Sequence, residues 1–354
     1  MTGYLLFIIS ILLCDRIKDK GRKVFAFFFI VTVFSGLRYG IGYDYYSYLD
    51  ACMWGSSRYE VWEPIPRYFA FVSQATTPFL FFFLSSIFIS LFYYLGIKRE
   101  GQFFLEEVLF YISFPFLFMN QLGIIRQGMA TAVVFYALTL DNKAILRRLV
   151  LIVIAYFCQL SSFVAILIII PWNKVSNKVL WIMLVGSLIV GSAIMPFIAD
   201  FINLGFLGDD VSQRASGYIN TESNSEGGLI SYLVYFIAVI VLFNYKKLVG
   251  LDNKNAYYIA CIVFGASLFA LFSFNISIAK RLCLLFFTPS ILIIPQLTHL
   301  LKVPKVLTVT MYIILLSLTI YVGSGNRRYD DPPGCSVTYP YRTIFDAKIM
   351  INHE

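Results

Sequence analysis

Apolar residues occur along this chain in long blocks that short polar stretches separate. The blocks cover residues 1–14, 24–37, 77–97, 107–120, 123–140, 144–171, 179–198, 229–244, 256–275, 282–299 and 304–322. A helix of about 20 mostly apolar residues crosses a bilayer, and most of these blocks approach or reach that length. The pattern predicts an all-α polytopic membrane protein with about 12 apolar segments, counting residues 144–171 as two of them.

Basic side chains gather between the apolar blocks. The clusters are Arg16 to Lys23, Lys98 with Arg99, Lys143 to Arg148, Lys174 with Lys178, Lys246 to Lys254, and Lys302 with Lys305. Cytoplasmic loops carry an excess of lysine and arginine, so we expect all of these clusters on the inner side of the membrane. This requires residues 144–171 to form two short pieces, 144–159 and 161–172, broken near residues 159–162.

Pieces this short cannot each cross a bilayer as simple rods. A broken or re-entrant pair is tolerated where its polar backbone is buried in protein or lines a wet cavity. The blocks 107–120 and 123–140 meet in the same way, at residues 120–123. The sequence therefore predicts a cavity that opens to the outer face.

The same assignment places both termini on the outer side. We expect a single integral membrane domain over residues 1–354, with outer loops at 38–76 and 199–228 and an outer C-terminal tail at 323–354. Residues 1–14 are expected to form a first span and not a signal peptide, because their positive charges follow the apolar block.

Composition supports a membrane protein. Of the 354 residues, 59% are hydrophobic and 14% are charged, whereas soluble domains average about 45–50% and about 25%. These values exclude soluble domains, a disordered chain, a secreted disulfide scaffold and a DNA-binding module. The net charge of +8 follows from the inner clusters, so we expect no nucleic-acid partner. Cys52 and Cys335 both fall in outer segments, where they are either paired or free.

Four arginines on the outer side carry the candidate chemistry. Arg38 follows a span, Arg126 lies just inside one, Arg281 opens another, and Arg342 lies in the tail. An arginine near the hydrocarbon is costly and usually faces the protein interior or a water-filled cavity. Its planar guanidinium matches phosphate oxygens, which would suit a lipid-linked pyrophosphate. For each arginine, snorkelling to headgroups or structural ion pairing is the alternative.

The first outer loop is rich in aromatic residues, among them Tyr45, Tyr48 and Trp62. Aromatic faces can stack on sugar rings, and an interfacial aromatic belt explains the same residues equally well. Asp44 and Glu63 lie in this loop too. Either carboxylate can act as a general base, or both can pair with the arginines.

Common metal and cofactor motifs are absent from the sequence. It contains no HExxH, no P-loop, no GxGxxG and no GxSxG, and its two histidines, His299 and His353, lie in no cluster. We therefore expect neither a bound metal nor a cofactor.

Several of the candidate residues fall in motifs that resemble one family. The motifs are Arg38-x3-Gly42-x-Asp44-x3-Tyr48 with Glu63-Pro64, Asn120-Gln121 with Arg126-Gln127 and Ala130, Arg281 with Phe287 and Pro295, and Tyr339-Pro340-Tyr341-Arg342. In this order and spacing they resemble the EpsG/Wzy-type polysaccharide polymerases, and the resemblance extends over nearly the whole chain.

The resemblance implies a membrane glycosyltransferase of GT-C-like architecture at the periplasmic face of the bacterial inner membrane. Such an enzyme transfers a growing O-antigen or surface glycan from undecaprenyl pyrophosphate to the non-reducing sugar of a lipid-linked repeat unit. The implied partners are lipid-linked oligosaccharides, the bilayer, a chain-length regulator and a flippase.

The resemblance also implies roles for single residues. The pyrophosphate-binding candidates are Arg38, Arg126, Arg281 and Arg342, with Arg126 and Arg281 as the main clamp. The sugar-binding candidates are Tyr45, Tyr48, Trp62, Gln127 and Gln159. Relatives often carry a histidine at Gln159, and a glutamine cannot accept a proton at neutral pH. The base is therefore Asp44 or Glu63, or the reaction needs little help from a base.

Two other function classes stay open at this point. A lipid-linked oligosaccharide flippase also needs arginines and a polar cavity, although alternating access favours charges deep in several spans and a repeated half. A polyprenyl-phosphate-sugar transferase would use an acidic pair with a metal in the first outer loop. That loop offers Asp44 and Glu63, which lie far apart in the sequence.

Overall fold

The computed structural model describes residues 2–54, 59–141, 143–193, 228–273, 275–325 and 336–346. Residues 199–227 of the predicted second outer loop, and Cys335, lie outside these ranges. Contacts gather the chain into two compact units, Met1–Phe163 with Ile294–Glu354, and Val164–Ile293. The expectation of one integral membrane domain stays a prediction.

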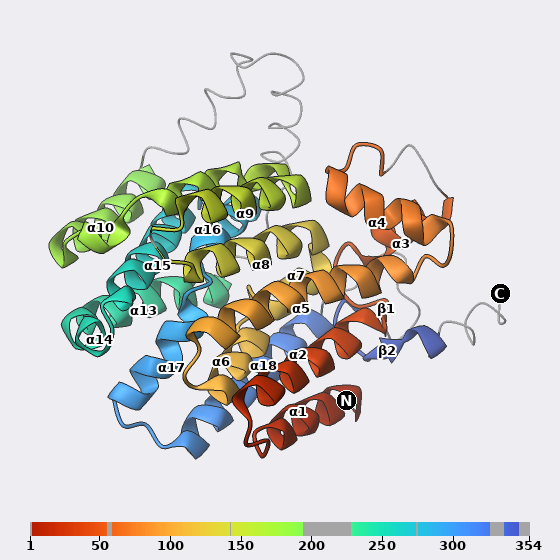
Figure 1. The fold of residues 1–354 in the computed structure, drawn as a ribbon, viewed down its shortest axis with the longest axis horizontal. Helices are drawn as coiled ribbons and strands as arrows, with labels where there is room; N and C mark the ends of the chain where they lie inside the picture. The colour runs from red at the N-terminus through yellow and green to blue at the C-terminus, as the bar shows by residue number, and fades with distance from the viewer. Residues whose placement is uncertain are drawn as a thin grey trace, which may run out of the picture. The chain divides into compact units, whose positions relative to one another are not determined.

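The first unit contains most of the N-terminal helices and the last long one. Its elements are α1 (Thr2–Cys14), α2 (Lys20–Gly36), β1 (Arg38–Tyr39), α3 (Tyr45–Trp54), α4 (Pro64–Gln74), α5 (Leu80–Glu100), α6 (Phe104–Ser113), α7 (Phe118–Gly123), α8 (Ile125–Thr139), α9 (Ile145–Cys158), α18 (Lys305–Ser324) and β2 (Arg342–Thr343). Helix α2 packs on α5, α5 on α8, and α8 on α9, so these four helices form a row (Figure 1). Helices α3 and α4 lie within the predicted first outer loop and pack on one another, and α4 packs on α5 and α9.

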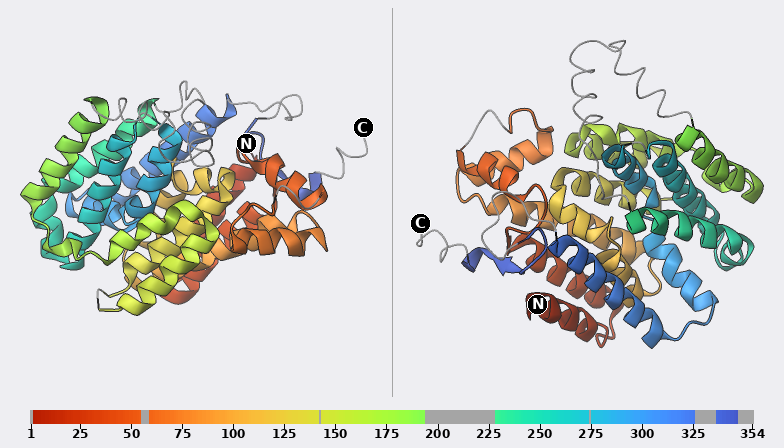
Figure 2. Two further views of the ribbon diagram at one scale, coloured as in Figure 1. Left: turned by 90° about the horizontal axis from the view of Figure 1, so that it is seen from above. Right: turned by 180° about the vertical axis from the view of Figure 1, so that it is seen from behind.

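The second unit is built around one buried helix. Its elements are η2 (Trp172–Lys174), α10 (Asn177–Ala193), α13 (Gly228–Phe243), α14 (Tyr245–Leu251), α15 (Lys254–Leu271) and α16 (Ile276–Phe287). Helix α15 contacts α10, α13, α14, α16 and η2, which surround it on several sides (Figure 2). Two elements cross the boundary between the units, η1 (Leu160–Ile169) and α17 (Ser290–Leu300).

Breaks in the helices have identifiable causes. Helix α9 ends at Cys158 and η1 begins at Leu160, which confirms the predicted break near residues 159–162. Residues 114–117, with Pro115, separate α6 from α7, because a proline removes a backbone donor. The apolar block at residues 282–299, for which the sequence predicts no break, is not a single straight helix. Thr288 and Pro289 divide it into α16 and α17, which are bent by 64°.

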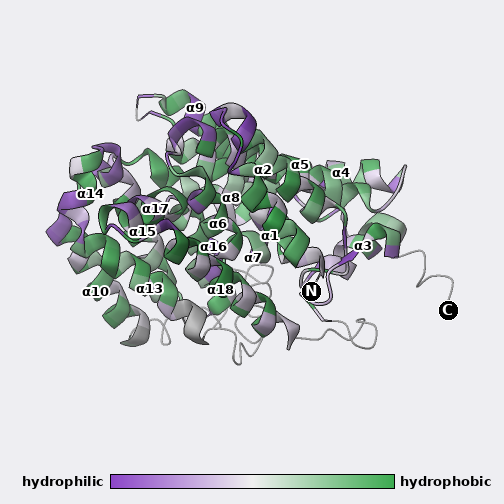
Figure 3. Cartoon of the chain, turned by 90° about the horizontal axis from the view of Figure 1, so that it is seen from below, coloured by the Kyte–Doolittle hydropathy of each residue, from purple (hydrophilic) through white to green (hydrophobic). Residues whose placement is uncertain are grey.

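The helices have the length and polarity of a membrane protein. In the described part of the chain, α5, α15 and α18 are long and apolar enough to cross a bilayer, and two bent pairs, α13 with α14 and α16 with α17, raise the number to five. Leu307, Met311, Ile314 and Leu318 lie exposed along one face of α18, as a lipid-facing helix requires. Hydrophobic residues cover most of the helices (Figure 3). The described residues therefore form an all-α membrane protein, apart from the short β1–β2 pair.

Candidate functional site

Three segments that lie far apart in the sequence lock together around residues 38–44. Strand β1 pairs antiparallel with β2, and the Gly42 N–H donates to the Val337 carbonyl at 2.9 Å. Gly42 has a φ of 110°, and a Cβ atom there would lie 2.2 Å from the carbonyl oxygen of Leu122. Only glycine permits this conformation at so close a backbone approach. Gly42 therefore lets the loop at residues 38–44 pack directly against the backbone at the end of α7.

The C-terminal residues tie the same loop to the first two helices. The Tyr4 hydroxyl donates to the Thr338 carbonyl at 2.6 Å, and the Tyr341 hydroxyl donates to the Phe34 carbonyl at 2.6 Å. These bonds join α1 and α2 to residues 336–344, in addition to the strand pair, the Gly42–Val337 bond and a bond from the Thr338 hydroxyl to the Ile320 carbonyl.

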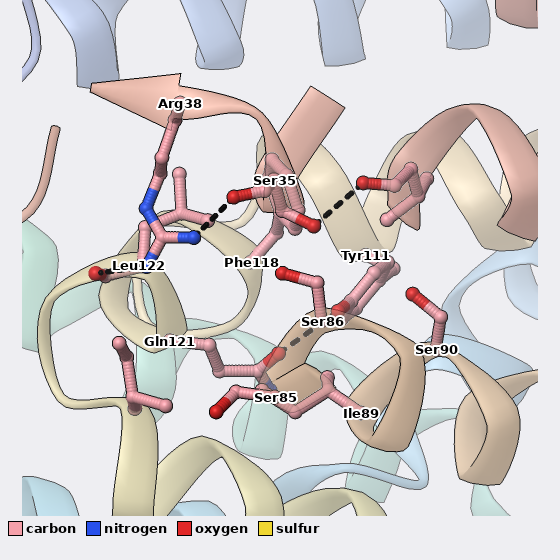
Figure 4. A pocket seen from close by; sticks show the side chains of 12 residues that line it. Ser35, Arg38, Ser85, Ser86, Ile89, Ser90, Tyr111, Phe118, Gln121 and Leu122 are labelled. Atoms are coloured by element: carbon pink, nitrogen blue, oxygen red, sulfur yellow. Dashed lines mark hydrogen bonds between the residues drawn. The ribbon is translucent and has the colours of Figure 1, made fainter. Parts of the chain in front are cut away.

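Arg38 fixes the loop from inside the protein. Its side chain is 2% exposed and donates to three carbonyl oxygens, those of Ile41 at 3.1 Å, Leu122 at 3.0 Å, and Ser35 (Figure 4). Burial lowers the pKa of Arg38 to about 10, which still keeps the guanidinium charged at neutral pH. Arg38 thus connects the end of α2 to the break between α7 and α8.

A small polar cavity lies beside Arg38 (Figure 4). Its polar lining residues are Ser35, Arg38, Ser85, Ser86, Ser90, Tyr111 and Gln121. The free space is about 10 Å³, roughly the room that one water molecule needs. This cavity is therefore too small to hold a sugar.

Gln121 joins two buried tyrosines beside this cavity. Its Nε2 donates to the Tyr93 hydroxyl at 2.7 Å, and the Tyr111 hydroxyl donates to its Oε1 at 2.8 Å. All three side chains are buried. Because a buried polar group without a partner is costly, this closed set favours one arrangement of the short helix α7.

Arg126 opens α8 and lies among residues of the first outer loop. Its Nη1 donates to Glu63 Oε2 at 2.8 Å, and its guanidinium lies 5.6 Å from the centre of the Trp62 ring. The Tyr48 hydroxyl lies close enough to its side chain to interact with the Arg126 charge. Burial raises the pKa of Tyr48, and this effect outweighs the opposite effect of the Arg126 charge. Arg126, Glu63, Tyr48 and Trp62 form one cluster, which we call the Arg126 cluster.

Glu63 connects this cluster to the break between α9 and η1. Its second carboxylate oxygen, Oε1, accepts the backbone N–H of Leu160 at 2.9 Å. The Glu63 and Arg126 side chains are 13% and 28% exposed, so the ion pair is largely shielded from water. Glu63, Arg126 and the break between α9 and η1, which the sequence singles out separately, therefore meet at one place.

The five sugar-binding candidates differ in their exposure. Tyr45 is fully buried, with its ring stacked 4.2 Å from that of Phe82 and its hydroxyl donating to the Arg38 carbonyl. Tyr48, Gln127 and Gln159 are buried as well. Trp62 is the one candidate that is not buried, and its ring packs against Tyr48 at 5.2 Å. Of the five, Trp62 is best placed to stack on a sugar.

The remaining candidates lie outside the Arg126 cluster. Asp44 is half-buried between β1 and α3, close enough to contribute to the raised pKa of Tyr48. Arg342 lies in β2, 6% exposed, with its guanidinium 5.5 Å from the centre of the Tyr39 ring. Arg281 lies half-buried in α16, and so belongs to the second unit.

Sequence reasoning missed two parts of this site. The hydrogen bonds that join Gln121 to Tyr93 and Tyr111 link residues from three helices. The one signal in the sequence is a polar residue inside an apolar block, and the motif that contains Gln121 implies no role for it. The second part is the Leu160 N–H that binds Glu63. Because it is a backbone group, the sequence indicates it only through the predicted break near residues 159–162.

Comparison with protein families agrees with the motifs. A family model described as the EpsG family matches residues 22–342, a range that includes Arg38, Glu63, Arg126 and Arg342. No curated protein and no solved structure matches the chain. Since the family model covers most of the sequence, the chain belongs to the EpsG family.

Proposed function

We propose that this protein polymerises a surface polysaccharide, such as O-antigen, from lipid-linked repeat units. Family membership supports a polysaccharide polymerase-type role. The observation that carries the finer proposal is the Arg126 cluster, which combines a guanidinium, a carboxylate and a partly exposed aromatic ring. These are the groups needed to hold a pyrophosphate, handle a hydroxyl proton and stack on a sugar.

The proposed donor is the growing glycan on undecaprenyl pyrophosphate, and the acceptor is a hydroxyl on the non-reducing sugar of a new lipid-linked unit. The hydroxyl oxygen attacks the anomeric carbon of the donor and forms the new glycosidic bond. The bond from that carbon to the pyrophosphate oxygen breaks, and its electron pair leaves with undecaprenyl pyrophosphate. The hydroxyl proton passes to a carboxylate, Asp44 or Glu63, and then to water.

Arg126 has the central role in this proposal. Charge develops on the pyrophosphate oxygens as the bond breaks, and a preorganised guanidinium stabilises that charge without rearranging. Arg38 donates to backbone carbonyls, so we assign it the positioning of the loop. Arg342 supports the same loop from β2. We propose Arg281 as the second arginine that binds the pyrophosphate.

We further propose a GT-C-like arrangement of about 12 apolar segments, with several of them broken or re-entrant. The active face would be periplasmic and the membrane would be the bacterial inner membrane. The lipid-linked oligosaccharides and the bilayer are the direct partners, and a chain-length regulator and a flippase are the proposed protein partners.

Substitution of Arg126 tests the proposal. We expect Arg126→Ala to abolish the surface-polysaccharide ladder on a gel, because removing one charge-stabilising donor costs about 10²–10³ in rate. Arg126→Lys keeps the charge and loses the planar fork, so we expect a shortened ladder. Arg67→Ala is the matched control, because Arg67 is exposed on α4 and its described hydrogen bond goes to the Glu60 carbonyl.

The ladder is read together with the amount of each variant in the membrane. A normal ladder from a normally expressed Arg126→Ala variant would overturn the assignment. In liposomes that contain purified protein and two lipid-linked units, elongation supports a polymerase. Translocation of the units without elongation would instead identify a flippase.

A further inference from the structure

The Glu63 carboxylate accepts hydrogen bonds from two donors that together form an anion-binding site. One oxygen accepts from Arg126 Nη1 at 2.8 Å and the other from the Leu160 N–H at 2.9 Å. The three residues come from the start of α4, the start of α8 and the start of η1. Both carboxylate oxygens are therefore held by donors that separate segments supply.

These donors suit a phosphate group as well as a carboxylate. A guanidinium binds either anion through charge-assisted hydrogen bonds. The Leu160 amide lies at the first residue of the ten-residue helix η1, and amides at helix starts bind phosphate oxygens. The Tyr48 hydroxyl, which lies close to the Arg126 side chain, adds a further polar group.

Two buried polar atoms, one on Arg126 and one on the residue after Leu160, have no partner among the described residues. They are Arg126 Nε and Ser161 Oγ, the second of which lies next to Leu160 in the chain. A carboxylate offers two oxygens, and both are already engaged. A phosphate group offers more acceptor oxygens than a carboxylate, so it can satisfy more donors at the same site.

We infer that Glu63 occupies a phosphate site in the unliganded protein and that a diphosphate group displaces it. This inference rests on the proposed function and identifies Glu63 as the counter-ion of Arg126 while no substrate is bound. The exchange leaves the shielded guanidinium paired at every stage, which avoids the cost of an isolated buried charge. A neutral ligand cannot displace Glu63 in this way, so the carboxylate selects for strongly anionic ligands. Asp44 is then the carboxylate that we assign to the acceptor hydroxyl.

The test is the affinity of the full-length protein for two probes, inorganic pyrophosphate and undecaprenyl pyrophosphate in nanodiscs, measured by calorimetry. Glu63→Gln keeps the shape of the side chain and removes its charge. We expect this variant to bind diphosphate about fivefold more tightly, or better, than the unaltered protein, because the internal competitor is weaker. Glu60→Gln makes the same charge change at an exposed position in the same loop and should leave the affinity unchanged.

A second variant protects the test against misfolding. Glu63→Asp keeps the charge but withdraws the carboxylate by one methylene, so its affinity should lie between those of the unaltered protein and Glu63→Gln. Arg126→Ala in the Glu63→Gln background should lose the gain. A gain with both probes, or with the lipid alone, supports the inference. A gain with inorganic pyrophosphate alone would exclude the lipid as the ligand of this site.

Unchanged or weaker binding by both Glu63 variants would overturn the inference. This result is separable from a failure of the proposed function, because diphosphate binding is measured without any elongation. Loss of the ladder in Arg126→Ala together with unchanged binding in Glu63→Gln would leave the polymerase proposal standing and remove the displaced carboxylate. Tighter diphosphate binding by Glu63→Gln, together with no elongation in liposomes, would support the displaced carboxylate and remove the polymerase proposal.

Discussion

Gly42 is the position at which a single methyl group should be most damaging. Its φ of 110° lies in a region that other residues rarely adopt. A Cβ atom there would lie 2.2 Å from the Leu122 oxygen, 2.6 Å from the Leu122 carbonyl carbon and 2.9 Å from the Gly123 nitrogen. All three are backbone atoms, so no side-chain rotation can relieve the clash.

The cost of Gly42→Ala follows from two contributions. A non-glycine residue held in such a conformation costs about 1–3 kcal/mol. Forcing extra volume into packed structure costs about 1–3 kcal/mol more. We therefore expect a loss of about 2–6 kcal/mol of stability, unless the loop moves away from residue 122. In that event the stability loss is smaller and polymer formation is lost instead, because Arg38 and the Arg126 cluster lose their support.

The assay combines equilibrium unfolding in mixed micelles with the polysaccharide ladder. Gly40→Ala is an informative comparison, because a Cβ there meets the flexible end of the Arg342 side chain at 2.5 Å. We expect it to cost clearly less than Gly42→Ala. Gly186→Ala is the control, since a Cβ at that helical position meets nothing within 4 Å. A Gly42→Ala variant with the stability and the ladder of the unaltered protein would refute the reasoning.

Two further changes test the surroundings of the site and the opposite end of the first unit. Gln121→Leu leaves the hydroxyls of Tyr93 and Tyr111 buried without a partner, so we expect a loss of about 2–4 kcal/mol of stability in the same unfolding assay. Tyr93→Phe and Tyr111→Phe, made together in the Gln121→Leu variant, should restore most of this stability. A triple variant as unstable as Gln121→Leu would contradict this expectation. Burial alone would raise the pKa of Asp15, but two lysine ammonium groups that contact it lower the pKa below its usual value. Asp15 therefore contributes stability that is complete above about pH 4 and is lost as the pH falls through its lowered pKa in the folded protein. An unfolding midpoint that falls between pH 6 and pH 3 as steeply in Asp15→Asn as in the unaltered protein would show that Asp15 has no such effect.

Local chemistry explains what the sequence predicted well. The break at Gln159 was predicted because basic clusters must lie on one side of the membrane and because polar residues interrupt an apolar block. Both signals can be read along the chain. The bend at Pro289 was missed even though proline lacks a backbone donor, because the surrounding residues are apolar enough to resemble one continuous span.

The burial of individual side chains in the site could not be predicted from the sequence. Tyr45 and Trp62 looked equivalent as aromatic residues of one loop, yet one is buried against Phe82 and the other is partly exposed beside Arg126. Arg38 and Arg126 likewise looked equivalent as outer arginines. Packing between distant segments decides that one donates to backbone carbonyls and the other to a carboxylate. Such differences depend on tertiary contacts that no local pattern records.

The pairing of β1 with β2 also sets an order of events during biogenesis. Residues 38–44 leave the ribosome roughly 300 residues before their partners at 336–344, a delay of about 15–60 s at ordinary rates of synthesis. The second unit is continuous in the sequence and is translated within that interval. The loop at residues 38–44 is therefore among the last parts to assemble. A nascent or prematurely terminated chain would carry its arginines and carboxylates without the support of residues 336–344, and under the proposed function it would elongate no glycan.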